Sequence, residues 1–348
     1  MKQIKKNILI FLAYFFISLG IFYSGSKYHI PWYGSGDFAN YSLMTTKPFD
    51  NDVQAAFAYR FITPTAAHYI YRYGLFYAPE KTPFKDNYSK QNEVFYDPSS
   101  LAALIFTNYL FLTLAAVFTY ITITKKIKKN DLVADTIALG LPILIYLSFS
   151  TIAHGFNGLT EGGSLFFISL LAYLFHEKKL IIFGTFVLLS VWQREVIPII
   201  IFVYILFAPV KIKKYAYLIL SLTAFISYLI IRKKFWPLPG SEDQLIFTAF
   251  YKNFFLLGFS KEFFFQGILA NNLIFFVFFS YIILGLKNIK FLFPYIMVVL
   301  IMIPICIGIG SSNGIARILN IASPLLVLCL GELLIKNKNY KKVNNDNT

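Results

Sequence analysis

Charged residues are scarce in this sequence: they make up 14% of its 348 residues, against about 25% in an ordinary soluble domain. Hydrophobic residues make up 57% and aromatic residues 19%. The apolar residues stand in long runs separated by short basic clusters, a pattern typical of a chain that crosses a bilayer repeatedly. Backbone groups in lipid must be hydrogen-bonded within their own segment, and the runs are too long for barrel strands. The sequence therefore predicts an all-α fold.

Cysteine is nearly absent, and several common site motifs are missing. Cys306 and Cys329 both lie in apolar runs, which predicts neither a disulfide framework nor a thiolate metal site. No Gly-rich loop ends in Lys-Ser or Lys-Thr, so a P-loop nucleotide hydrolase is not indicated. The four histidines share no metal-ligand spacing. The net charge of +15 does not indicate a nucleic-acid partner, because the basic residues stand at the ends of apolar runs.

The apolar runs predict a polytopic integral membrane helical bundle of about ten passes. It would form a single transmembrane domain over residues 1–335, including an external loop over 24–99, followed by a disordered cytoplasmic tail over 336–348. The expected spans are 7–23, 100–124, 132–151, 161–176, 180–192, 195–210, 215–232, 264–286, 291–309 and 316–335. Two of these runs are short, and Lys178-Lys179 precedes them while Lys213-Lys214 follows them. We therefore expect the chain to turn back at Gln193-Arg194-Glu195.

Short basic loops set the predicted orientation, with both termini in the cytoplasm. Arg232-Lys233-Lys234 is the basic cluster that this topology places outside. A residue bias toward Lys, Asn, Ile, Phe and Tyr favours a bacterial source, and hence the inner (plasma) membrane. Membrane lipids are then one class of partner.

The first external loop is rich in aromatic residues. From Val53 to Phe76 it mixes apolar and aromatic residues with Arg60 and Arg72, a composition that suits helices lying in the headgroup layer. Pro64 is expected to interrupt this segment. An anchoring helix without chemistry is the alternative reading.

Two short motifs of this loop carry a family resemblance. Asp37-x-x-x-Tyr41 follows the first span, and Tyr59-Arg60-x-x-x-Pro64 lies in the aromatic segment. Together they resemble the GT-C superfamily of polytopic membrane glycosyltransferases, in particular its poorly characterised bacterial members. The resemblance implies that Asp37 is the catalytic base. It also implies a polyprenyl-phosphate sugar as donor and a glycan or lipid as acceptor, with transfer on the non-cytoplasmic face.

The chemistry of such a transfer suits the residue types present. A carboxylate near the interface can take the proton of an acceptor hydroxyl, and the planar fork of arginine suits a departing phosphate. The donor is already lipid-linked, so no nucleotide site is needed. No cofactor follows from these motifs, and a divalent cation stays open.

Further polar residues fall on the same predicted face. Glu161 opens a span, Arg194 and Glu195 lie at the turn between two short runs, and Arg317 starts the last span. Charged residues inside or close to the bilayer are costly unless they are paired or line a cavity. The candidate substrate-binding residues are Tyr41, Tyr59, Arg60, Glu161, Arg194, Glu195 and Arg317.

Plainer and competing interpretations stay open. Arg194 and Glu195 could neutralise partners within the bundle, and Arg317 could reach lipid headgroups. A lipid-linked sugar flippase or transporter, or a surface-glycan polymerase, are the alternative functions. A transporter should show helices broken near the midplane and symmetry between its halves.

Overall fold

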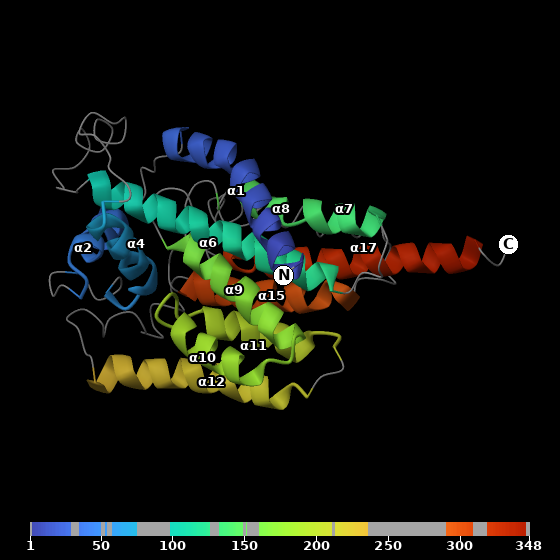
Figure 1. Cartoon of the computed structure of the whole chain (residues 1–348). Coiled ribbons are helices and arrows are strands. Elements are labelled where there is room, and N and C mark those ends of the chain that lie inside the picture. The colour runs from blue at the N-terminus through green and yellow to red at the C-terminus, as the bar shows by residue number, and fades with distance from the viewer. Residues whose placement is uncertain are drawn as a thin grey trace.

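The computed structural model describes residues 2–28, 35–49, 53, 58–74, 98–125, 132–148, 151, 160–210, 213–235, 290–308 and 319–345. All regular secondary structure in these ranges is helical, which confirms the all-α prediction (Figure 1). The helices are α1 Lys2–Tyr28, α2 Ser35–Thr46, α4 Ile62–Arg72, α6 Pro98–Thr124, α7 Leu132–Gly140, α8 Ile143–Leu147, α9 Glu161–His176, α10 Leu180–Ser190, α11 Ile197–Phe207, α12 Tyr215–Ile230, the π-helix η2 Ile231–Phe235, α15 Phe293–Gly308 and α17 Ser323–Asn345. The predicted span 264–286 lies outside the described residues.

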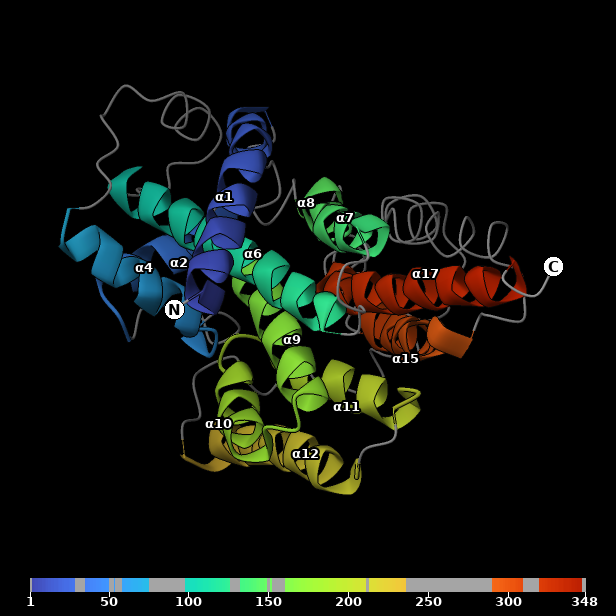
Figure 2. The same ribbon diagram turned by 45° about the vertical axis from the view of Figure 1, so that its right-hand side comes forward.

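Helices α6 and α9 pack against each other at the centre of the molecule (Figure 2). Apolar side chains such as Leu112, Leu165 and Ile168 are fully buried in the core to which both helices contribute. Helix α9 also contacts α10, α11 and α17, while α6 contacts α1 and α4. The pair therefore connects the N-terminal helices to the rest of the bundle.

The turn predicted at Gln193-Arg194-Glu195 is present between α10 and α11. Each of these helices has 11 residues, which is a length of about 16 Å at 1.5 Å per residue. Helix α11 begins at Ile197 and has Pro198 in its first turn. Proline is accepted there because the first N–H groups of a helix have no partner within it.

One expected span and one prediction about a proline need correction. The span expected over 132–151 is divided into α7 and α8, and Pro142 lies between the two helices. Pro142 cannot donate a backbone hydrogen bond, so it ends the run of helical bonds. Pro64 was expected to interrupt a helix, yet it lies in the first turn of α4, where its missing N–H costs nothing.

The C-terminal tail also differs from the prediction of disorder after residue 335. Helix α17 continues to Asn345. Nucleation is the expensive step of helix formation, and the apolar first half of α17 supplies a formed helix. The polar residues that follow can extend it at low cost.

Within the described residues, two helices are long and apolar enough to cross a membrane, at Ser99–Thr124 and Tyr215–Phe235. The other apolar helices in the described residues have 10–17 residues, so the ten-pass arrangement stays a prediction.

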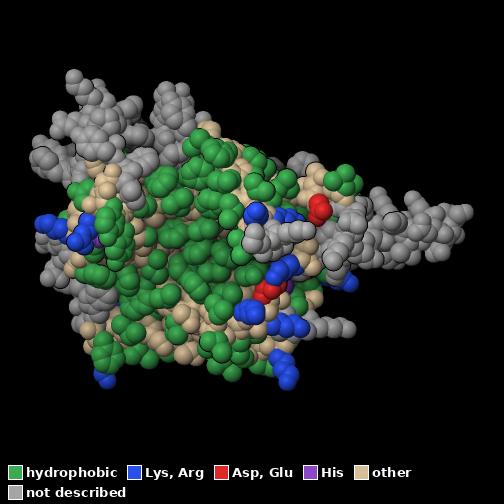
Figure 3. Space-filling model, in the orientation of Figure 1, with side chains coloured by type: hydrophobic (Ala, Val, Ile, Leu, Met, Phe, Trp, Pro, Cys, Tyr) green, Lys and Arg blue, Asp and Glu red, His purple; other side chains and the backbone are tan. Residues whose placement is uncertain are grey.

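Much of the apolar surface is exposed. On α12, Ile219, Leu222, Ile226 and Ile230 form an exposed stripe at helical spacing. The face shown in Figure 3 is mainly hydrophobic between charged side chains near its two ends.

Candidate functional site

The segment that leads into α4 is attached to the turn between α10 and α11 by an ion pair. Arg60 donates from Nη2 to Glu195 Oε1 at 2.8 Å and from Nε to Glu195 Oε2 at 3.3 Å. Both ends of the carboxylate are therefore engaged by the guanidinium fork, the geometry that arginine favours with carboxylates. The two residues are 135 positions apart in the sequence.

A second ion pair lies deeper, between the same turn and the first residue of α9. Arg194 donates from Nη1 to Glu161 Oε1 at 2.9 Å, and the exposed fractions of the two side chains are 6% and 0%. Buried charges are retained in proteins only when they are paired and hydrogen-bonded. The sequence left open the interpretation that Arg194 neutralises a partner within the bundle. The pair with Glu161 agrees with that interpretation.

The two pairs are coupled through Glu195. Burial alone would raise the pKa of Glu195, but Arg60, through its charge and hydrogen bonds, and the nearby charge of Arg194 outweigh burial. The net effect lowers the pKa of Glu195 from 4.5 to about 2. Burial would lower the pKa of Arg60, whereas Glu195 and Tyr41 raise it, so that it ends well above its ordinary value. Glu195 and Arg60 are consequently both held in their ionised forms.

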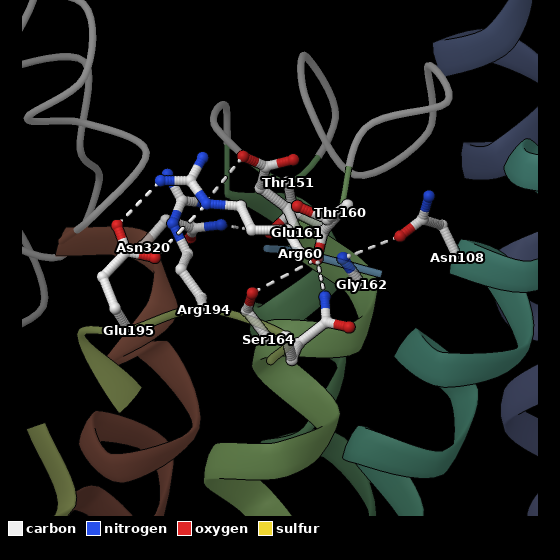
Figure 4. A network of polar contacts seen from close by, with 11 residues as sticks. Arg60, Asn108, Thr151, Thr160, Glu161, Gly162, Ser164, Arg194, Glu195 and Asn320 are labelled. Carbon is white, nitrogen blue, oxygen red and sulfur yellow. Dashed lines mark hydrogen bonds and ion pairs between the residues drawn. The ribbon is translucent and has the colours of Figure 1, made fainter. Parts of the chain in front are cut away.

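Neutral hydrogen bonds fix the same elements in place. Thr63 Oγ1 donates to Gln193 Oε1 at 2.9 Å, and Gln193 Nε2 donates to the carbonyl of Thr160 at 2.7 Å. Asn108 Oδ1 of α6 accepts from the backbone N–H of Gly162 at 3.0 Å. Figure 4 shows how the Asn108–Gly162 hydrogen bond and the two ion pairs lie around the start of α9.

Two glycines make this approach of helices feasible. A Cβ on Gly162 would lie 2.6 Å from the backbone oxygen of Asn108, and one on Gly163 would lie 2.5 Å from Thr63 Oγ1. Both distances are far inside van der Waals contact. The Gly162-Gly163 step therefore lets α6 and α4 come close to the N-terminus of α9.

A row of aromatic rings borders the Arg60–Glu195 pair. Tyr59 lies edge-on to Tyr228 with 6.3 Å between ring centroids, and Tyr228 lies 5.4 Å from Trp192. Trp192 in turn contacts Phe61 at 5.5 Å. The guanidinium of Arg232 lies 4.8 Å from the centre of the Tyr59 ring. The rings come from the first loop, from the 191–196 turn and from α12.

The structure brings together most of the residues selected from sequence. Tyr59, Arg60, Glu161, Arg194 and Glu195 lie in or beside the network. Tyr41 is fully buried in α2 and acts electrostatically on Arg60. Asp37 lies one helical turn before Tyr41 in α2, whose described side chains begin at Asn40.

Two positions were not identified from the sequence as part of a site, and one selected position cannot be placed. The sequence singled out Arg232 only as part of a basic cluster on the predicted external side. That unusual location could have indicated that Arg232 lies near the site. Asn320 gave no signal, yet it accepts from Ser148 Oγ at 2.5 Å and donates to Thr151 Oγ1 at 2.9 Å in a buried cluster. Arg317 lies outside the described residues.

The described residues contain no group of three or more His, Cys, Asp or Glu side chains that could hold a metal ion. What they offer instead is two arginine–carboxylate pairs bordered by aromatic rings. The rings can pack against a flat apolar face of a ligand. Comparison with protein-family models, curated proteins and solved structures finds no match to this chain.

Proposed function

We propose that this protein is a polytopic membrane glycosyltransferase that moves a sugar from a polyprenyl-phosphate donor to a glycan or lipid acceptor. The observation that carries the proposal is the charged network at one end of an apolar helical bundle. In it, the Tyr59-Arg60 motif of the first loop meets the start of α9 and the 191–196 turn. Burial of paired charge in an apolar bundle indicates function by default.

The distribution of polar groups supports a membrane setting. Exposed apolar side chains cover α1, α10 and α12, whereas Glu161, Gln193 and Arg194 are buried inside. Helices that expose apolar side chains while charged side chains are buried among them are what a bilayer favours and what water disfavours. In the proposed topology both termini are cytoplasmic and the protein lies in the bacterial inner membrane.

Helix direction supports one orientation. Helix α9 starts at Glu161 in the network, and Glu177 directly after it pairs with Lys125 at the end of α6. Exposed Lys178 and Lys179 follow. The 16 residues of α9 separate the two ends by about 24 Å. By the positive-inside rule the lysine end faces the cytoplasm and the network faces outward.

In the proposed reaction the acceptor hydroxyl oxygen attacks the anomeric carbon of the donor sugar. The bond between that carbon and the phosphate oxygen breaks, and the lipid phosphate leaves with the bonding electrons. The acceptor proton passes to the carboxylate of Asp37, the base that the family resemblance implies. The position of Asp37 in α2 supports this role. Asp37 lies one helical turn before Tyr41, and Tyr41 interacts electrostatically with Arg60.

A flippase or transporter of lipid-linked sugars is the second candidate, and one observation favours it. Helices α10 and α11 are each 11 residues long and meet at a turn that carries two charges. Discontinuous helices with charged connections are typical of transport sites. Helices α7 and α8 form a second interrupted run, but the residues between them, Leu141 and Pro142, carry no charge.

The proposal is tested with purified protein reconstituted in vesicles that contain radiolabelled polyprenyl-phosphate sugars and acceptor lipids. We expect transfer by the native protein and a loss of at least about 100-fold in Asp37→Asn, because removal of a general base costs about that factor or more. Asp135→Asn is the matched control, since Asp135 is an exposed aspartate of α7. It should transfer at the native rate.

Other results separate the alternatives. Equal transfer by native protein and Asp37→Asn would remove Asp37 as base and leave the transferase standing. Absence of transfer from every donor, together with movement of the sugar-lipid across the vesicle bilayer, would replace the transferase with the flippase.

A further inference from the structure

The aromatic row beside the Arg60–Glu195 pair continues outward to a fifth ring. Phe49, which follows α2, packs against Phe61 with 5.2 Å between the ring centroids. Phe61 lies 5.5 Å from Trp192, and the planes of these two rings are inclined by 32°. Phe49 is 57% exposed, whereas Phe61 and Trp192 pack against the core and are half-buried. The outer part of the row can therefore be reached from outside the fold.

The backbone of Phe49 is unusual for an aromatic residue. Its φ angle is +64°, in the left-handed region that bulky side chains rarely adopt. Strained conformations of this kind are concentrated at active sites and ligand clamps, where the surrounding structure holds them. Here the strain falls on the residue whose ring extends the row outward.

The Arg60–Glu195 pair beside the row is also accessible. The exposed fractions of its two side chains are 19% and 27%, against 6% and 0% in the deeper ion pair. Arg60 directly precedes Phe61, and Trp192 lies three residues before Glu195. The ion pair therefore holds the segments that carry these two rings next to each other.

The carboxylate of Glu195 has hydrogen-bonding capacity beyond the ion pair. Two carboxylate oxygens together accept about four hydrogen bonds, and Arg60 supplies one to each oxygen. A hydroxyl group of a ligand can therefore donate to Glu195 without displacing Arg60.

Aromatic rings next to an accessible ion pair suit a sugar better than a hydrocarbon chain or a bare anion. One face of a hexose ring consists largely of C–H groups, which pack on aromatic rings. The hydroxyls of the sugar donate to carboxylates and accept from guanidinium groups. A hydrocarbon chain would remove water from the ion pair and return no hydrogen bonds, and a bare anion would meet the negative charge of Glu195.

We propose that Phe61 and Trp192 form the platform on which the sugar ring of the substrate stacks, with Phe49 at its outer edge. Glu195 accepts hydrogen bonds from the hydroxyls of that sugar. The ligand class is a neutral hexose, free or within a larger glycolipid. This inference rests on the proposed function for the lipid carrier of the sugar.

The experiment separates the sugar from its lipid carrier. Equilibrium binding to the full-length protein in nanodiscs of neutral lipid is measured for radiolabelled polyprenyl phosphate and for the glucose, galactose and mannose derivatives of that lipid. We expect native protein to bind one of the derivatives at least about tenfold more tightly than the bare carrier, the effect of one stacked ring with its hydrogen bonds. Equal affinity for the bare carrier and all three derivatives would overturn the proposal.

Variants of the two platform rings test where this preference arises. Trp192→Leu and Phe61→Leu should each lower the preference about 3- to 10-fold, because one aromatic contact is lost, and should bind the bare carrier as native protein does. Phe293→Leu is the matched control, because Phe293 is exposed and its ring packs 5.4 Å from that of Phe207 at the opposite end of α11. A native preference in both platform variants would contradict the proposal, and so would an equal fall in Phe293→Leu.

Fluorescence gives a second measurement that leaves the platform intact. The double change Trp32→Phe with Trp236→Phe leaves Trp192 as the sole tryptophan of the chain. Its emission should change when the preferred sugar derivative is added and should stay constant with the bare carrier. The same emission with both ligands would remove Trp192 from the sugar site, even if Trp192→Leu does not fold.

The outcome for the platform is distinct from the outcome for the transferase. Absence of sugar transfer, with a sugar preference that still depends on Trp192, would defeat the transferase and leave the sugar site in place. Sugar transfer by native protein, with an unchanged preference in Trp192→Leu and Phe61→Leu, would defeat the platform and leave the transferase.

Discussion

The two ends of α9 carry charge in different ways. At its start, Glu161 and Arg194 form a buried pair. Just past its end, Glu177 pairs with Lys125, and the exposed fractions of these side chains are 24% and 44%. Lys178 and Lys179, which follow, are exposed as well. Charge at the first end is enclosed by the fold, whereas charge at the second end is largely open to its surroundings.

The difference shows which charges the fold must compensate. Removing a pair of charges from water costs several kcal/mol per ion, and mutual attraction offsets this only with good geometry. An exposed pair costs little and contributes little. The retention of the Glu161–Arg194 pair therefore asks for an explanation beyond stability, and the proposed site gives one.

The strongest test of this difference between the two ends of α9 is to remove one member of the buried pair. Arg194→Leu leaves the carboxylate of Glu161 buried without its ion-pair partner, so we expect a loss of about 3–5 kcal/mol in the free energy of unfolding. The double change Glu161→Leu with Arg194→Leu should recover much of it. Unfolding in mixed detergent micelles measures both.

Lys125→Leu is the matched control at the other end of α9. Removing this exposed pair should cost under about 1 kcal/mol. Equal losses in Arg194→Leu and Lys125→Leu would show that the two ends do not differ in the way described.

A second prediction concerns the pH range in which the Arg60–Glu195 pair contributes to the free energy of unfolding. The pKa of Glu195 in the folded protein, about 2, lies below its ordinary value of 4.5. The pair therefore stabilises the fold above pH 4.5, and the contribution is lost as the pH falls from 4.5 toward 2. We expect native protein to exceed Glu195→Gln by about 1.5–3 kcal/mol at neutral pH.

The measurement is the difference in unfolding free energy between native protein and Glu195→Gln from pH 7 to pH 2. The difference should stay constant to about pH 4.5 and shrink below it. A difference that grows on acidification would mean that the carboxyl is neutral in the folded protein and would contradict the ion pair.

The smallest effect is expected from the close approach of helices. Gly162→Ala would force its Cβ against the backbone of Asn108, so α6 and α9 must separate, at a cost of about 1–3 kcal/mol. Gly140→Ala is the control, because a Cβ there meets nothing within 4 Å. Thermal unfolding of the two variants compares them, and similar melting temperatures would count against tight packing at the start of α9.

Local patterns were enough to predict several elements of the fold. Long apolar runs predicted an all-helical chain, and lysines on both sides of two short runs predicted the turn at Gln193. These predictions succeeded because hydrophobicity and helix formation depend on residues close together in the chain. The prediction that Pro64 interrupts a helix failed, and so did the prediction of one continuous span over 132–151, because the position of a proline within a helix decides its effect.

The sequence by itself determined that this is a helical chain with an apolar exterior and a small set of charged residues that needed partners. Only the tertiary structure decided which partners they found. Arg60 meets Glu195 across 135 residues, Arg194 meets Glu161 across 33, and Arg232 meets Tyr59. Such pairings depend on how whole helices pack, because any arginine can satisfy any carboxylate and only the bundle brings two of them within 3 Å.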